Sequence, residues 1–207
     1  MTRTPPDQTT AKRGRPRAFD RDAALAKATQ LFWQRGYEAT SIGELTRAMG
    51  INPPSLYAAF GDKKALFLEV VSTYGETYGA FTRQALDEEP RAYDGMARLL
   101  REAAVSFTDP THPRGCLVIC AATNVTEQSS DVEADLRALR AGNIAEFERR
   151  FRAAVEAGET APDADPHAMA NFYAAVFQGM SQRARDGGTT DELRAVAEMA
   201  IAAWPKP

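Results

Sequence analysis

Cysteine and histidine are scarce in this chain, with two residues of each among 207. His112 and His167 both lie beside prolines, and no serine or cysteine motif accompanies them. The sequence also lacks a glycine-rich phosphate loop, an H-E-x-x-H motif and a C-x-x-C motif. We therefore expect no enzyme active site, no metal and no cofactor.

Both cysteines, Cys116 and Cys120, lie four residues apart in a predicted helix. This spacing, together with the cytoplasmic location expected below, disfavours a structural disulfide. Two interpretations remain open. A helical i, i+4 pair can bind a soft metal or sense oxidants, whereas a buried free cysteine usually behaves as a small hydrophobic residue.

Long hydrophobic runs are also missing. No apolar segment approaches the roughly 20 residues that a membrane-spanning helix needs. Residues 1–19 contain no apolar core of a secretory signal. We expect a cytoplasmic protein without a membrane partner.

Charge is distributed unevenly along the chain. Residues 1–65 carry eleven Lys or Arg against six Asp or Glu, a charge of +5, so the remaining residues carry −8 of the total of −3. A basic N-terminal part on an acidic body indicates that this part alone has a polyanionic partner.

The first 18 residues are rich in Pro, Thr, Arg and Lys and lack apolar periodicity, which predicts a disordered arm. Arg13, Arg15 and Arg17 lie in an R-G-R-P-R run that resembles the core of an AT-hook. An extended arginine segment of this kind fits the narrow, negative minor groove of DNA. The alternative is a solvated basic tail.

Local signals in residues 19–65 predict three short helices leading into a fourth. Ser41 and Glu44 have the spacing of a capping box. Gly50 is suited to end the second helix, and Asn52 followed by Pro53 is suited to begin the third. Two helices joined by so short a turn form a helix-turn-helix, whose second helix enters the DNA major groove. A two-helix corner of any all-α domain carries similar signals.

Further residues carry a family resemblance. The segments LFWQRGYEATSI and LTRAMGINPPSLYAAFGDKKALF, preceded by the G-R-P-R arm, resemble the N-terminal domain of the TetR family of transcriptional regulators over residues 14–70. The resemblance implies an all-α homodimer with a homeodomain-like helix-turn-helix domain and a C-terminal helical ligand-binding and dimerisation domain. The chain departs from the family pattern at Pro53 and Pro54. Neither proline has a hydrogen-bond donor, so readout must rely on few hydrogen bonds and on apolar or shape contacts.

Candidate DNA contacts follow from this resemblance and from side-chain chemistry. The family tyrosine matched by Tyr57 contacts the DNA backbone or a thymine methyl, and the lysine matched by Lys63 grips phosphate, whereas Lys64 is expected to be solvated. Thr40 and Ser41 adjoin unpaired N–H groups that suit a phosphate. The full set outside the arm is Thr40, Ser41, Arg47, Asn52, Pro53, Ser55, Tyr57 and Lys63.

We expect residues 66–207 to form the second domain. Its predicted helices cover residues 63–86, 91–108, 114–122, 129–158, 166–186 and 190–204. The segment 114–122 is apolar on every side and predicts a buried central helix, while length argues against a strand. The resemblance implies that the last two helices pair with their copies in a four-helix bundle.

Aromatic and a few polar side chains of these helices are typical of a small-molecule pocket. The predicted lining is Tyr78, Phe107, Cys116, Cys120, Asn124, Phe147, Phe177 and Gln178. We thus expect a homodimeric repressor that a small-molecule effector releases from a palindromic double-stranded operator. The alternatives are a redox-sensing regulator that uses Cys116 and Cys120, and a DNA-localised protein-interaction module.

Overall fold

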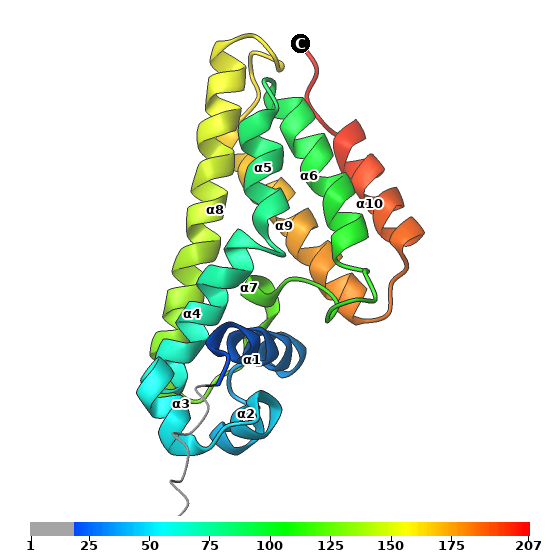
Figure 1. Cartoon of the computed structure of the whole chain (residues 1–207). Helices are drawn as coiled ribbons and strands as arrows, with labels where there is room; N and C mark the ends of the chain where they lie inside the picture. Colours follow the sequence, from blue (N-terminus) through cyan, green and yellow to red (C-terminus); the bar gives the residue numbers. More distant parts are fainter. Residues whose placement is uncertain (1–18) are drawn as a thin grey trace, which may run out of the picture.

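The computed structural model describes residues 19–207, which fold into helices and loops without any strand in that range (Figure 1). The predicted arm, with Arg13, Arg15 and Arg17, lies outside the described residues. No helix within 19–207 is both long enough and apolar enough to cross a membrane. The helices are α1 (Arg21–Arg35), α2 (Ile42–Met49), α3 (Pro53–Phe60), α4 (Lys63–Glu76), α5 (Ala80–Glu88), α6 (Ala92–Ser106), α7 (Leu117–Cys120), the 3₁₀ turn η1 (Glu127–Ser129), α8 (Ser130–Glu156), α9 (Pro166–Arg185) and α10 (Thr190–Ala202).

Helices α1, α2 and α3 form a small unit at one end of the molecule, and α4 leads from it into the body (Figure 1). The predicted capping signals are all in use. Ser41 and Glu44 form the capping box of α2, and the Asn52 side chain accepts from the Ser55 N–H at 2.9 Å to begin α3. Gly50 adopts the left-handed conformation between the two helices, with φ +73°. The helix-turn-helix prediction is therefore confirmed.

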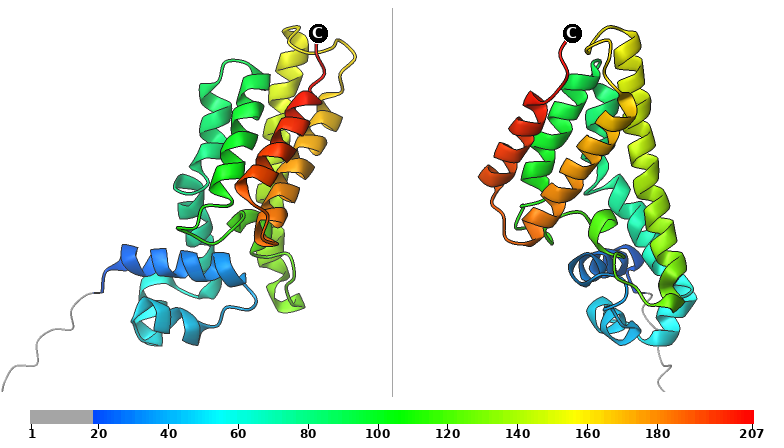
Figure 2. Two further views of the ribbon diagram at one scale, coloured as in Figure 1. Left: turned by 90° about the vertical axis from the view of Figure 1, so that its right-hand side faces the viewer. Right: turned by 180° about the vertical axis from the view of Figure 1, so that it is seen from behind.

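The body consists of α5, α6, α8, α9 and α10, with α8 running along its whole length (Figures 1 and 2). Its core is continuous with that of the small unit. At the end far from α1–α3, Trp204 packs its ring edge-on against Phe151 and Tyr93. The all-α, two-part architecture agrees with the sequence prediction.

Two helix predictions were wrong in detail. Residues 63–86 are not one helix, because α4 ends at Glu76 and α5 begins at Ala80. The Gly79 N–H instead donates to the Tyr74 carbonyl oxygen at 2.8 Å and closes a turn between them. A Cβ atom at position 79 would lie 3.0 Å from the Tyr74 ring and 3.2 Å from the Tyr74 carbonyl oxygen, so the turn favours a residue without a side chain.

The predicted buried helix over 114–122 is a single turn, α7, whose Val118 and Ile119 are only half-buried. The chain reaches α7 through Gly115, which has φ +76° and lies against the Ser181 backbone. Leu139 of α8 is likewise 45% exposed and lies on the wall of a cavity. Side-chain hydrophobicity alone does not distinguish a core position from a cavity wall.

Gly115→Ala is expected to lower the free energy of unfolding by about 2–4 kcal/mol. A methyl group there would lie 2.7 Å from the Ser181 carbonyl oxygen, in a backbone conformation that side chains rarely adopt. Gly142→Ala is the matched control, because Gly142 is exposed within α8 and has no neighbour within 4 Å. Urea unfolding should show the control unchanged or up to about 1 kcal/mol more stable. Equal stability of both variants would contradict this packing.

Candidate nucleic-acid interface and adjoining cavity

Helix α3 buries one face and exposes the other. Leu56 and Phe60 point into the core, while Tyr57 is 50% exposed. Pro53 and Pro54 occupy the first turn, and both are exposed. A helix-turn-helix places this exposed face against a DNA groove.

The two lysines that open α4 lie in different environments. Lys63 is half-buried, with its Nζ 4.2 Å from the centre of the Tyr37 ring, and this burial lowers its pKa. The Lys64 Nζ lies 2.8 Å from an Asp131 oxygen and 3.0 Å from an Asp135 oxygen, and these hydrogen bonds raise the pKa of Lys64 to about 12. The prediction that Lys64 is merely solvated was wrong, because α8 supplies it with two acids.

Thr40 and Ser41 are neighbours in the sequence, but one side chain is buried and the other is exposed. Ser41 is exposed at the start of α2. Thr40 is fully buried, and its hydroxyl donates to the Gly36 carbonyl oxygen at 2.7 Å. The Thr40 hydroxyl therefore closes the loop between α1 and α2 and is not available to a phosphate, whereas the contact expected at the N–H groups of this turn stays a prediction.

Several cations of the small unit already have acidic partners. Arg21 pairs with Glu69 at 2.6 Å, and Arg35 pairs with Glu44. Arg47 is exposed on α2 and has no ion pair within residues 19–207. Arg47 and Lys63 are thus the candidate phosphate contacts that carry a charge without an acidic partner in that range.

Hydrogen bonds to backbone carbonyl oxygens join the small unit to the body. The Tyr37 N–H donates to the Ala121 carbonyl oxygen at 2.6 Å, one residue beyond α7. The Trp33 ring N–H donates to the Gly115 carbonyl oxygen at 3.2 Å. Arg185, the last residue of α9, donates to the Trp33 carbonyl oxygen at 3.1 Å. A shift of α7 or α9 would therefore act directly on α1.

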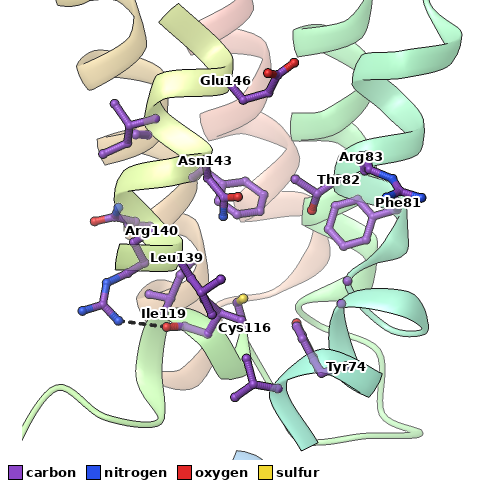
Figure 3. Close-up of a pocket in the computed structure, with 18 of the residues that line it drawn as sticks. Tyr74, Phe81, Thr82, Arg83, Cys116, Ile119, Leu139, Arg140, Asn143 and Glu146 are labelled. Carbon is purple, nitrogen blue, oxygen red and sulfur yellow. Dashed lines mark hydrogen bonds between the residues drawn. The ribbon is translucent and has the colours of Figure 1, made fainter. Parts of the chain in front are cut away.

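A cavity of about 550 Å³ lies in the body between α4 and α5 on one side and α8 on the other (Figure 3). Apolar side chains form most of its wall. The lining residues include Leu68, Val71, Tyr74, Phe81, Leu86, Phe107, Cys116, Val118, Ile119, Leu139, Ile144, Phe147, Ala174, Phe177 and Gln178. Such a cavity suits a mainly apolar organic molecule.

Polar groups lie at two places on this cavity. Arg140 and Asn143 come from α8, and Arg140 also donates to the Val118 carbonyl oxygen at 3.0 Å (Figure 3). Tyr74 and Cys116 lie together on the α7 side, where burial raises the pKa of both groups. The part of the cavity lined by Tyr74 and Cys116 is thus uncharged at neutral pH. The charged side chains of the lining are Arg140 and Glu146 on α8 and Arg83 on α5.

Five of the eight residues predicted for a pocket line this cavity, namely Phe107, Cys116, Phe147, Phe177 and Gln178. Three do not. Tyr78 is 39% exposed, and its hydroxyl accepts a hydrogen bond from the Gln30 side chain. Asn124 is exposed in the loop after α7. The Cys120 Sγ lies 3.5 Å from the Ser181 Oγ. The break between α4 and α5 redirects Tyr78, and the shortness of α7 leaves Asn124 outside.

Sequence reasoning missed the polar residues that α8 contributes. Arg140, Asn143 and Glu146 recur every three residues and share a helix face with Phe147. This spacing was a usable signal. It was overlooked because polar residues on a long helix are usually assigned to solvent.

We expect iodoacetamide to modify Cys116 in the folded chain at least about tenfold more slowly than in the unfolded chain at pH 7. Cys116 is buried, and its raised pKa keeps the thiolate, which is the reactive form, scarce. Peptide mass spectrometry with and without denaturant measures both rates. Equal rates in the two states would contradict this expectation and favour the redox-sensing alternative.

Comparison with known proteins addresses both parts of the chain. The family described as bacterial regulatory proteins, tetR family, matches residues 24–70, and a tetracyclin repressor-like C-terminal domain matches residues 92–200. The repressor ComR of Escherichia coli K12 is 36% identical over 195 residues, covering 94% of this chain and 93% of ComR. The repressor BdcR of the same strain is 31% identical over 187 residues, covering 90% of each chain.

A solved structure is similar over nearly the same length. The TetR family regulator CifR, as a cysteine-substituted mutant complexed with a 26-bp double-stranded operator, has 47% sequence identity and a TM-score of 0.87. The alignment covers 93% of this chain and 100% of the CifR chain. The similarity therefore includes both the helix-turn-helix unit and the helical body.

Proposed function

The chain belongs to the TetR family of bacterial regulatory proteins, and we propose that it is a homodimeric repressor released from a palindromic operator by a small-molecule effector. It is a DNA-binding transcriptional regulator and not an enzyme. What the proposal adds is the DNA-contacting surface, the dimer interface and the effector cavity.

The observation that supports DNA contact most directly is the exposed face of α3 beside Lys63. Tyr57 offers a hydroxyl on this face, and Lys63 offers a cation one residue beyond the Asp62 cap. Four further predicted contacts belong to the same motif: Ser41 caps α2, Arg47 lies in its last turn, Asn52 caps α3, and Ser55 lies in the first turn of α3. The CifR structure, which contains operator DNA, has the same fold at high similarity.

The proposed dimer interface is the outer face of α9 and α10, which lie side by side on one side of the body (Figure 2). Its centre is apolar, and Met199 is 76% exposed. Large apolar side chains on both helices, Phe172 on α9 and Val196 and Met199 on α10, are exposed, and exposed apolar patches often mark interaction sites. The residues of this dimer face are Phe172, Ala175, Val176, Gly179, Ala195, Val196, Met199 and Ala203.

The proposed effector site is the cavity between α5 and α8, and α7 connects it to the DNA-binding unit. Cys116, Val118 and Ile119 line the cavity, and the next residues lead to Ala121, which accepts from the Tyr37 N–H. A molecule that displaces α7 would tilt α1 and change the spacing of the two α3 helices in a dimer. Effector and operator then favour different states and must weaken each other's binding.

Enrichment of random DNA duplexes on the full-length protein tests the proposal. We expect a palindrome whose half-sites lie about 34–36 Å apart, because a dimer reaches successive major grooves. Compounds that fit the cavity are then screened for release of this duplex. No enrichment, or enrichment of one asymmetric half-site, would count against the dimeric repressor.

A further inference from the structure

The exposed face of α3 is nearly devoid of hydrogen-bonding side chains. The helix has the sequence PPSLYAAF, which contains no charged residue and no Asn or Gln. Pro53, Pro54, Tyr57 and Ala58 are its exposed side chains, and only Tyr57 carries a polar group. The half-buried Ser55 adds one hydroxyl.

Neighbouring groups do not offer the paired hydrogen bonds that read a base. The Asn52 side-chain oxygen accepts from the Ser55 N–H at 2.9 Å, so Asn52 keeps its NH2 donors but lacks the free oxygen that a paired contact with adenine also needs. Lys63 is held against the Tyr37 ring at the start of α4, and Arg47 lies on α2. These cations are placed for phosphates, which fix position but carry no sequence information.

Each base pair offers a different contact in the major groove. Guanine is read by Arg or Lys, and adenine by Asn or Gln, through paired hydrogen bonds, whereas the thymine 5-methyl group accepts an apolar contact. The exposed prolines and alanine of helix α3 can make apolar contacts of this last kind. Pro54 and Ala58, one helical turn apart, lie about 5–6 Å from each other, which spans one to two base steps.

We propose that α3 selects its operator through thymine 5-methyl groups, contacted by Pro53, Pro54 and Ala58, and that base hydrogen bonds contribute little. This inference rests on the proposed function, because it requires α3 to enter the major groove. It specifies the chemistry of the operator positions under α3: a methyl-bearing pyrimidine.

Replacing thymine by deoxyuridine tests the proposal, because this change removes only the methyl group. We use the duplex enriched on the full-length protein and measure Kd by fluorescence anisotropy. Each contacted thymine replaced should weaken binding about fourfold, the factor that matches roughly 0.8 kcal/mol for one buried hydrocarbon group. The same number of replacements outside the half-sites should leave Kd unchanged.

Methylated cytosine separates the methyl group from the base pair. Replacing a contacted T·A pair by 5-methyl-C·G keeps the methyl group, whereas C·G removes it. The methylated duplex should bind about fourfold more tightly than the unmethylated one. Equal affinities of these two duplexes, or of the thymine and deoxyuridine duplexes, would overturn the proposal.

Two variants connect the effect to α3. Pro54→Ala and Ala58→Gly each remove apolar atoms from the exposed face, so the deoxyuridine penalty should fall below twofold at the contacted position. Pro54→Ala is compatible with the first turn of a helix, so it tests the proposal even if Ala58→Gly loosens α3. An undiminished penalty in both variants would overturn the assignment. A selection that yields no preferred duplex would overturn the proposed function together with this inference.

Discussion

Val196→Arg is expected to convert the dimer into monomers and to weaken operator binding by about 100- to 10,000-fold, the range in which linked binding exceeds single-site binding. Val196 belongs to the proposed dimer face and is 42% exposed in the single chain. A two-fold interface brings the same surface of both subunits together, so one substitution introduces two cations into one apolar patch. Like charges in that position repel each other and lose hydration.

Val105→Arg is the matched control for this experiment. Val105 is 47% exposed on α6, and the face of α10 nearest to it carries Arg194 and Glu198, which are not part of the dimer face. Light scattering gives the mass of both variants, and anisotropy with the selected duplex gives their affinities. The control should remain dimeric with unchanged Kd. A dimeric, fully active Val196→Arg variant would show that the subunits meet elsewhere, and a monomeric wild-type protein would favour the protein-interaction alternative.

Lys63→Ala is expected to weaken operator binding by about 10- to 100-fold and to reduce the salt dependence of binding. Each phosphate contact contributes about 0.9 to the slope of log K against log salt, so loss of one contact per subunit lowers the slope of a dimer by about 2. Lys63, unlike Lys64, makes no ion pair within residues 19–207, so its charge is available to DNA.

Lys64→Ala provides a neighbouring lysine with the opposite expectation. Its ammonium group is held by Asp131 and Asp135 at the surface, so its removal should change the free energy of unfolding little and leave the salt slope unchanged. Titrations at several salt concentrations measure both slopes. A reduced slope for Lys64→Ala, with an unaltered slope for Lys63→Ala, would reverse the assignment of the two lysines.

The helix-turn-helix was predictable because its determinants lie within a few residues of one another. The Ser41–Glu44 capping box, the left-handed Gly50 and the Asn52–Pro53 start of α3 each act locally, and the structure contains all three. Helix ends that depend on packing were less predictable. The break between Glu76 and Ala80 follows from a turn around Tyr74 that hydrophobic periodicity does not encode.

The candidate site also contains some residues whose placement was predictable from the local sequence and others whose placement was not. Exposure of Tyr57 follows from the sequence, because Leu56 and Phe60, four residues apart, share the buried face of a short amphipathic helix and Tyr57 lies off that face. Burial of Thr40 depends on a hydroxyl contact with the end of α1, and exposure of Asn124 depends on where α7 ends. Such contacts join elements whose relative positions are not a local property of the chain.

By itself, the sequence determined the class of the protein, the three short helices, the likeness to a regulator family and the contrast between a basic N-terminal part and an acidic body. The tertiary structure alone decided which aromatic residues face a cavity, which of two adjacent lysines is free of acidic partners, and how α7 connects the cavity to α1. The physical reason is range. Caps and periodicity act within one or two helical turns, whereas a cavity or an ion pair requires segments distant in the sequence to pack at a defined distance.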